Sequence, residues 1–198
     1  MPLAKKDWME LNKLNTQLFE VCHISESDIQ ETFTIGKPSG NGVVRYYKLM
    51  AMNEEQEGKA RTYIVKDISD REIVAYFTLK TGMMTERTGL LIHDNCSAIE
   101  IANFAINDSY KINHPEVTDE LEHIGKYIFS QFIIPIVKEI QSLVGAKYLQ
   151  IYALPEKSLI AHYEGMGFSR TSNKVERYIH RHIKPLYDKG CIFMYQEI

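Results

Sequence analysis

The sequence predicts an α/β (α+β) protein in which helices cover both faces of a mixed, mostly antiparallel sheet. Two stretches rich in β-branched and aromatic residues, 61–67 and 72–82, flank the short polar segment 68–71 and predict an antiparallel hairpin. A strand, a long helix and a second strand over 98–153 predict a crossover between parallel neighbours. Helical patterns before the hairpin add helices that must pack on this sheet.

Length and composition set the broad class of the protein. The chain has 198 residues, which is typical of one domain with a sizeable core, and we assign residues 1–198 to a single domain. A net charge of -3 gives no global sign of nucleic-acid binding. Three widely spaced cysteines, Cys22, Cys96 and Cys191, are typical of reduced thiols. The sequence shows neither a signal-peptide pattern nor an apolar run near the roughly 20 residues of a membrane span. We therefore expect a cytoplasmic protein without a membrane partner.

The N-terminal part predicts helices and one turn. In residues 7–20, four apolar side chains share one helical face, so a helix is predicted; they are Trp8, Leu11, Leu14 and Leu18. Ser25 or Ser27 is a candidate cap for a helix in 25–33. The segment 37–42, "KPSGNG", predicts a turn. Residues 43–56 predict a helix, although 43–47 would equally suit the start of a strand.

The segment 98–108, "AIEIANFAIND", predicts a strand. Its interior contains two polar residues, Glu100 and Asn103, which are unexpected in such an apolar run. The segment 117–145 then predicts a long helix closed by Gly145, with a kink or local break at Pro135.

The C-terminal part predicts two further strands and a short helix. Residues 147–154, "KYLQIYAL", predict a buried strand, and 156–165 predict the short helix. Residues 190–198 predict the last strand.

The order of elements resembles that of the GNAT superfamily of acyl-CoA-dependent N-acyltransferases. The match over 158–168 is the most specific, because its tyrosine, glutamate, glycine and phenylalanine fall in register with the family segment A-x-x-F-Y-E-K-L-G-F. A helix before the hairpin is similar to that of the subgroup of aminoacyl-tRNA-acetylating toxins. Four segments carry the resemblance: 71–82 "REIVAYFTLKTG", 99–108 "IEIANFAIND", 123–129 "HIGKYIF" and 158–168 "SLIAHYEGMGF".

The resemblance implies a fold, a co-substrate and a set of binding residues. The central strands near 99–106 and 147–153 are expected to splay apart, and acetyl-CoA is expected to bind between them. The main chain of Phe104, Ala105 and Ile106 would hold the pantetheine arm. The start of the following helix would bind the pyrophosphate; it comprises His123, Ile124, Gly125, Lys126 and Tyr127.

The pyrophosphate segment departs from the family pattern Gln/Arg-x-x-Gly-x-Gly/Ala. When Gly125 is set on the final glycine, Glu120 takes the Gln/Arg position and His123 takes the first glycine. The connection 108–122 is also longer than the usual family loop, and it is acidic. An acidic side chain facing the phosphates would weaken binding, whereas main-chain donors do not depend on side-chain identity.

Two residues are candidates for catalysis. The resemblance implies that Tyr163 protonates the leaving thiolate, although the residue pattern alone fits a core aromatic beside Leu159 and Ile160. Glu100 is a candidate base for deprotonating the acceptor amine, with a solvated or structurally paired carboxylate as the alternative. His162, next to Tyr163, is expected on the surface.

The predicted function is transfer of an acetyl group from acetyl-CoA to a primary amine. The acceptor is left open among a small molecule, a peptide and an aminoacyl-tRNA, and a homodimer is also left open. A non-catalytic GNAT-fold binding protein is the alternative from another class. The basic, tyrosine-containing segment 170–189 would suit RNA, or it is a solvated helix face. His180 and His182 lack an apparent third ligand, so no metal site is predicted.

Overall fold

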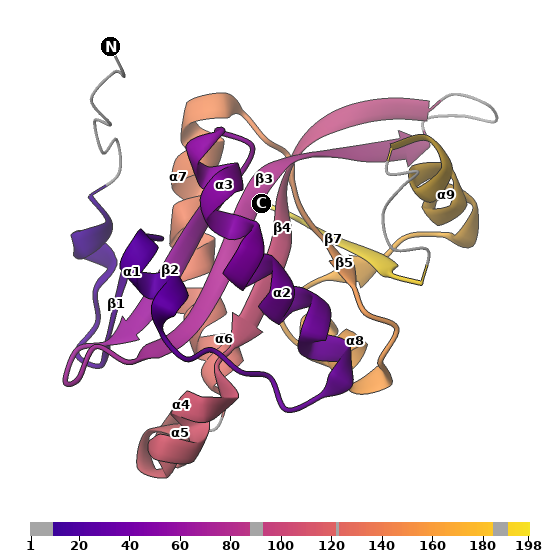
Figure 1. Cartoon of the computed structure of the whole chain (residues 1–198). Coiled ribbons are helices and arrows are strands. Elements are labelled where there is room, and N and C mark those ends of the chain that lie inside the picture. Colours follow the sequence, from indigo (N-terminus) through magenta and orange to yellow (C-terminus); the bar gives the residue numbers. More distant parts are fainter. Residues whose placement is uncertain (1–9, 88–92, 122, 184–189) are drawn as a thin grey trace.

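The computed structural model describes residues 10–87, 93–121, 123–183 and 190–198 (Figure 1). Within these residues, seven strands form one sheet in the order β1-β2-β3-β4-β5-β7-β6. The β4–β5 pair is parallel and every other pair is antiparallel, so the predicted mixed, mostly antiparallel sheet is confirmed. The strands are β1 Phe19–His23, β2 Arg61–Asp67, β3 Ile73–Arg87, β4 His93–Ile106, β5 Tyr148–Ala153, β6 Ser169–Arg170 and β7 Ile192–Glu197.

Helices cover both faces of this sheet, as predicted. Figure 1 shows α2 and α3 in front of the strands and α7 behind them. The α-helices are α1 Glu26–Gln30, α2 Asn41–Leu49, α3 Ala51–Gln56, α4 Asp108–Asn113, α5 Pro115–Leu121, α6 Ile124–Ile128, α7 Ile134–Val144, α8 Lys157–Glu164 and α9 Asn173–Tyr178. Two 3-10 helices, η1 Leu11–Leu14 and η2 Pro38–Gly40, and two π-helical turns, η3 Phe129–Ile133 and η4 Ile179–Ile183, complete the described elements.

Each face of the sheet has its own hydrophobic core. On one face, Tyr47 and Ala51 of α2 and α3 pack with Tyr76 of β3. On the other face, Ile128 and Phe132 of the α6–α7 region pack in one cluster with strand residues. A third, smaller cluster joins α9 and η4 to the far end of the sheet; it contains Met84, Ala98, Tyr148, Val175, Ile179 and Phe193.

The prediction of a helix over residues 7–20 is wrong for the residues described. After the short η1 turn, the chain forms the edge strand β1, which pairs antiparallel with β2. Phe19 and Val21 are buried and Glu20 is half-buried, so the pattern has the two-residue period of a strand. The open edge of β2 supplies hydrogen-bond partners that a helix at this position would not use. Trp8 lies outside the described residues.

The other N-terminal predictions are mostly confirmed. Ser25 caps α1, because its N–H donates to Asp28 Oδ2 at 2.7 Å. The predicted turn at 37–42 contains η2, and α2 begins within it at Asn41. The segment 43–56 is helical and not a strand, with a break at Met50 between α2 and α3.

The long helix predicted over 117–145 is divided into pieces. The segment between β4 and α6 contains two short helices, α4 and α5; no helix was predicted at α4, and α5 contains the first residues of the predicted long helix. A second helical run begins at Ile124 and ends at Gly145, whose positive φ of 69° closes it. The predicted irregularity at Pro135 is confirmed, because the π-helical turn η3 ends just before it. Proline has no N–H to donate to the preceding turn, which explains a local change of hydrogen bonding there.

Candidate active site

The two central parallel strands separate in the middle of the sheet. Pairing between β4 and β5 begins at Ala98–Tyr148 and ends at Ile101–Ile151, whereas β4 continues to Ile106. The predicted splay is therefore present. Beyond Ile101, the main-chain groups of β4 that face β5 have no strand partner among the described residues, so they are available to a ligand.

A β-bulge accompanies the separation. On the β3 side, Thr78 pairs with Asn103 and Leu79 pairs with Ile101, so Ala102 is the extra residue of β4. A bulge bends its strand and increases the local twist. The bulge therefore lies where β4 leaves β5.

A cleft of about 400 Å³ lies against the end of β4 that follows the separation. It brings together five of the residues predicted for the site: Phe104, Ala105, Ile106, Gly125 and Tyr163. The other lining residues are Ile35, Lys37, Ser39, Gly40, Val43, Asp108, Lys111, Leu154, Glu156, Ser158, Leu159 and His162. Segments far apart in the sequence thus converge where α2, α6 and α8 approach the sheet (Figure 1).

The remaining predicted side chains of the pyrophosphate segment do not line this cleft. His123 and Lys126 are exposed at the start of α6, and Ile124 is buried in the core. The ring of Tyr127 packs edge-on against Phe19, with ring centroids 5.9 Å apart. Apart from Gly125, this segment is therefore suited to contribute main-chain groups and the charges of its exposed side chains.

The start of α6 has the main-chain geometry of an anion site. The carbonyl of His123 accepts hydrogen bonds from the N–H groups of Lys126 at 2.9 Å and Tyr127 at 3.0 Å. The preceding N–H groups of Ile124 and Gly125 have no carbonyl one turn earlier within the helix. Free N–H groups and the helix dipole both favour an anion at this end.

Gly125 permits a close approach between α6 and α8. A Cβ atom built on Gly125 would lie 3.2 Å from Nε2 of His162 and 3.8 Å from Cγ1 of Ile106. His162 lines the cleft, so its predicted surface position is wrong. Burial and the positive charges of His123 and Lys126 lower the pKa of this imidazole.

The position of His162 in the cleft could have been predicted from the sequence, but its place next to Tyr163 on the helix suggested a different face. Neighbouring residues on a helix are separated by about 100°, so both can line one concave wall. The cleft-lining positions of α8 are Ser158, Leu159, His162 and Tyr163, which form two pairs with i,i+4 spacing.

Tyr163 is held at the cleft by aromatic packing. Its ring contacts Phe168 edge-on at 5.8 Å, and Phe168 in turn contacts Phe129 at 5.7 Å. Gly167, with φ of 95°, turns the chain so that Phe168 N–H donates to the carbonyl of Tyr163 at 3.0 Å. Burial raises the pKa of the Tyr163 phenol well above its usual range, so the hydroxyl keeps its proton at neutral pH.

Glu100 lies away from the residues that line the cleft. It is fully buried on the rung just before the β4–β5 pairing ends, where Oε2 accepts a hydrogen bond from Gln150 Nε2 at 3.2 Å. A catalytic role for Glu100 therefore requires a route from this buried pair to the acceptor, and it stays a prediction.

Charged groups also occur at the cleft. Lys111 pairs with Asp108 at 2.7 Å, and Lys37 pairs with Glu156 at 3.8 Å. Glu120, which occupies the family's Gln/Arg position, is exposed on α5 and is not among the residues that line the cleft.

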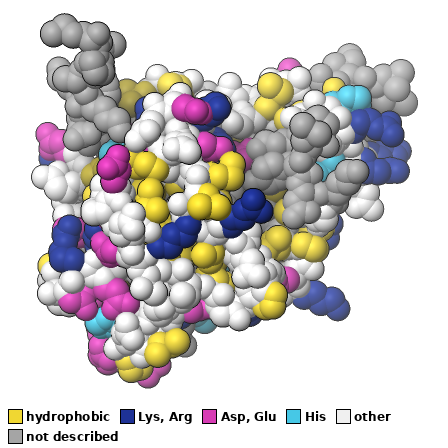
Figure 2. Space-filling view, viewed as in Figure 1, with side chains coloured by type: hydrophobic (Ala, Val, Ile, Leu, Met, Phe, Trp, Pro, Cys, Tyr) yellow, Lys and Arg dark blue, Asp and Glu magenta, His cyan; other side chains and the backbone are white. Residues whose placement is uncertain are grey.

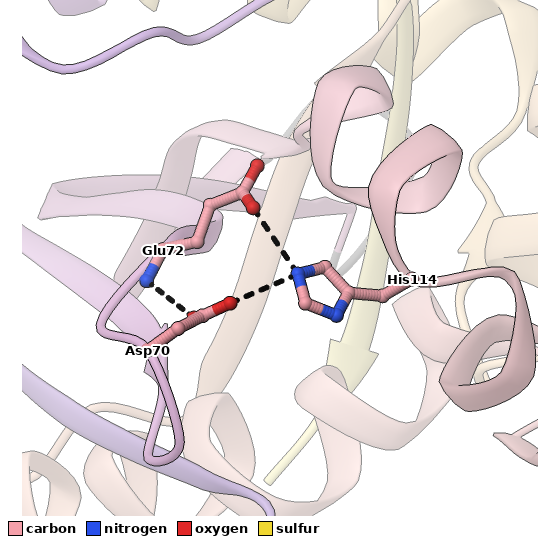
Figure 3. A group of neighbouring side chains, drawn as sticks. All are labelled: Asp70, Glu72 and His114. Carbon is pink, nitrogen blue, oxygen red and sulfur yellow. Dashed lines mark hydrogen bonds and ion pairs between the residues drawn. The ribbon is translucent and has the colours of Figure 1, made fainter.

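A separate cluster of charged side chains joins α4 to the turn between β2 and β3 (Figure 3). Nε2 of His114 lies 3.1 Å from both Asp70 Oδ2 and Glu72 Oε2. Donor atoms of these three residues lie within 4.8 Å of one another, so they are the group in the described chain most suited to a metal ion. A protonated histidine between two carboxylates accounts for the same geometry. The cluster fixes the C-terminal end of α4, which also contributes Lys111 to the cleft.

Comparison with known proteins establishes the fold. No protein-family model and no curated protein sequence matches the chain. Among solved structures, a tyrosine-to-phenylalanine mutant of KacT has a TM-score of 0.65 at 14% identity, covering 91% of this chain and 95% of that one. A tyrosine-to-phenylalanine mutant of the AtaT toxin, bound to the C-terminus of the antitoxin AtaR and acetyl-CoA, has a TM-score of 0.57 at 14% identity, covering 90% and 92%. The complex of KacTA with DNA has a TM-score of 0.61 at 14% identity, covering 90% and 92%.

These likenesses define the class of protein by its architecture. The chain described here shares the GNAT fold of these structures over about nine tenths of its length. Among the described residues, no helix has both the length and the apolar character that crossing a membrane requires.

Proposed function

We propose that this protein is an N-acetyltransferase that transfers the acetyl group of acetyl-CoA to a primary amine. The observation that carries the proposal is the separation of β4 from β5 beside a cleft that contains both the helix start at Gly125 and the phenol of Tyr163. Each feature alone has a structural explanation. Their convergence supports a site for an extended acyl-CoA donor next to a proton donor.

The residues of the cleft fit the parts of the co-substrate. Main-chain groups of Phe104, Ala105 and Ile106, beyond the last β4–β5 pair, would hold the amide-containing pantetheine arm. The N–H groups at Ile124 and Gly125 would hold the pyrophosphate. The structure of AtaT with acetyl-CoA supports this class of ligand for the fold.

Tyr163 is suited to act as the general acid. When the acceptor nitrogen attacks the acetyl carbon, the carbon–sulfur bond breaks and the sulfur leaves as a thiolate. Tyr163 would donate its phenolic proton to that sulfur, because the phenol is protonated at neutral pH and reaches the cleft wall. The hydrophobic packing around its ring would keep the hydroxyl in a defined position.

Glu100 is our candidate for a base acting through water. A lysine-type amine with a pKa of about 10.4 is mostly protonated at neutral pH, whereas an α-amine with a pKa of about 8 needs a base much less. The amide of Gln150 donates to Oε2 of Glu100 and thereby orients the carboxylate. The direct geometry supports Tyr163 more strongly than Glu100, because only Tyr163 lines the cleft.

A second candidate function is toxin-like acetylation of aminoacyl-tRNA. Two observations favour it: the solved structures with this fold include the AtaT toxin, and α9 and η4 together expose a row of basic side chains. We therefore propose three classes of acceptor: small amines, peptides and aminoacyl-tRNA. A homodimer stays a separate prediction.

Calorimetry with acetyl-CoA tests the proposed function first. We expect saturable binding and a higher melting temperature, because a ligand of the native state stabilises it by mass action. Release of free CoA thiol should then be measured with polyamines, amino acids, peptides and aminoacyl-tRNA as acceptors. Absence of binding at millimolar acetyl-CoA would favour a non-catalytic GNAT-fold protein instead.

A further inference from the structure

His162 faces the start of α6 across the cleft. Its Nε2 and Cε1 atoms would lie 3.2 Å and 3.6 Å from a Cβ built on Gly125. Both residues line the cleft, and Ile106 at the end of β4 borders the same position. No ring nitrogen of His162 has a hydrogen-bond partner in the part of the chain that is described, so both remain available to a ligand.

The surroundings of His162 favour an anion. Burial is the main cause that lowers its pKa, and the positive charges of His123 and Lys126 add to it. Two carboxylates, Asp108 and Glu156, also line the cleft, but each lies beside a lysine of its own. A negative ligand at this position would stabilise the protonated form of the imidazole.

We propose that His162 contacts the pyrophosphate of acetyl-CoA and takes up a proton from solvent as the co-substrate binds. This inference rests on the proposed function. The protonated Nε2–H would donate a charge-assisted hydrogen bond to a phosphate oxygen, beside the main-chain N–H groups of Ile124 and Gly125. No covalent bond forms or breaks in this step, and the added proton is released to solvent when the product leaves.

This role compensates for the departure at the pyrophosphate segment. Glu120 stands where the family pattern has Gln or Arg. Its side chain is exposed and is not among the residues that line the cleft. A cation for the phosphates would instead come from α8, through the close approach that Gly125 allows. Because Gly125 has no Cβ, the imidazole of His162 can lie close to the main-chain N–H groups at the start of α6.

Proton uptake by His162 would make the affinity for acetyl-CoA depend on pH in one direction. A bound anion would raise the pKa of His162, so affinity is greatest below the pKa of the free protein and is lost as pH rises through the higher pKa of the complex. The other titratable or charged groups that face this part of the cleft must be considered in the fit. They are Lys37 before α2, Asp108 and Lys111 of α4, His123 and Lys126 of α6, and Glu156 and Tyr163 at α8.

Proton-linked calorimetry tests the inference directly. Wild-type protein, His162→Gln and the control His182→Gln should each be titrated with acetyl-CoA near pH 6 and pH 8, in buffers of different ionisation enthalpy. His182 is exposed and packs at a tilt against Tyr178, outside the cleft. Wild type and the control should take up a fraction of a proton near pH 6, and His162→Gln should not. The variant should bind about 10-fold more weakly near pH 6, as expected for the loss of a charge-assisted hydrogen bond, and the difference should shrink near pH 8.

Truncated ligands locate the contact. ADP, which keeps the pyrophosphate, should reproduce the proton uptake, whereas pantetheine, which has no phosphate, should not. Because His162→Gln could fold poorly, an NMR titration of the wild-type histidine resonances with and without ADP provides a variant-free test. The His162 titration should move to higher pH with ADP.

The outcomes separate the two claims. Binding of acetyl-CoA without proton uptake, uptake that survives in His162→Gln, or an unmoved His162 titration would each overturn the role of His162 and leave the proposed function standing. Failure of the wild-type protein to bind acetyl-CoA at millimolar concentration would overturn the proposed function and this inference with it.

Discussion

Gln150 donates a hydrogen bond to Glu100 at 3.2 Å, one rung before the parallel strands β4 and β5 separate. Both side chains are fully buried, and Oε1 of Gln150 has no hydrogen-bond partner within the described residues. Gly82 borders the pair, because a Cβ there would come within 2.7 Å of Gln150 Nε2. A buried polar pair at this branch point is costly unless it is fully hydrogen-bonded, so packing alone does not account for its presence.

The variant Glu100→Gln tests whether this carboxylate is the base. Turnover with a lysine-type amine should fall roughly 100-fold or more, because general base catalysis is typically worth 100-fold to 10,000-fold. Turnover with an α-amine acceptor should change much less, because more of that amine is already neutral. The ratio of kcat/KM between the two acceptors is the measurement. An equal loss with both acceptors would show that Glu100 is structural.

Gly82→Ala should destabilise the protein. The added methyl group would overlap the amide of Gln150 in a buried site, and such overpacking typically costs about 1–3 kcal/mol. Gly42→Ala is the matched control, because Gly42 lies in α2 with open space where its Cβ would be. The control should be neutral or more stable by up to about 1 kcal/mol. Urea unfolding measures both, and equal stabilities of the two variants would contradict the close contact at Gly82.

Tyr163→Phe should separate catalysis from packing. The ring contact with Phe168 is kept and only the hydroxyl is lost, so the melting temperature and acetyl-CoA affinity should hardly move. Turnover should fall roughly 100-fold to 10,000-fold if the phenol is the general acid. Single-turnover measurement with a poor acyl donor is needed, since slow product release would hide a loss in the steady state. Wild-type rates in that assay, together with a stability loss of about 1 kcal/mol, would identify Tyr163 as a packing residue.

His114 should make stability depend on pH. Partial burial of its ring opposes the charge, but the hydrogen bond that the imidazole donates to Glu72 and the negative charges of Asp70 and Glu72 outweigh it, so the pKa of His114 is raised. A raised folded-state pKa gives stability that is fully present below the unfolded value of about 6.5 and is lost as pH rises through the folded value. His114→Gln should therefore lower the free energy of unfolding by roughly 0.2–1 kcal/mol near pH 5.5, the range of partly exposed ion pairs.

The difference between His114→Gln and wild type should shrink at pH 9, where the imidazole is neutral. Urea unfolding at the two pH values is the measurement. A difference that grows with pH would show that the cluster in Figure 3 does not stabilise the fold through a protonated histidine.

The basic row on α9 and η4 tests the RNA-dependent alternative. Lys174, Arg177 and Arg181 are exposed at i, i+3 and i+7 spacing, and no carboxylate in the described residues forms an ion pair with them. Lysine and arginine side chains lie at the right edge of the surface in Figure 2, over α9. If this row binds tRNA, affinity should fall steeply with salt, because cation–phosphate contacts release counterions.

The double variant Arg177→Glu with Arg181→Glu should weaken tRNA binding further and flatten the salt dependence. Filter binding at low salt is the measurement, with acetyl-CoA affinity as the folding control. No complex with the wild-type protein at low salt would remove this alternative and leave small amines and peptides as acceptors.

Local patterns in the sequence determined most of the sheet. The hairpin β2–β3, the strands β4, β5 and β7, and the short helix α8 all follow from residue type and spacing, because each buries a face whose period is fixed by backbone geometry. The cleft positions of Gly125 and Tyr163 followed from the resemblance carried by "HIGKYIF" and "SLIAHYEGMGF". Only the tertiary structure decided that Phe19–His23 is a strand, because the open edge of β2 selects a strand where the apolar spacing also fits a helix.

Tertiary structure also decided the two site features that the sequence interpretation missed or left open. His162 reaches the cleft because Gly125 lets α6 approach α8, and a contact between residues 37 positions apart has no local signal. Glu100 is buried because Gln150, 50 residues later, lies beside it in the parallel register. Strand and helix formation depend on neighbours within a few residues, whereas burial, pKa and access to a ligand depend on which distant segments the fold brings together.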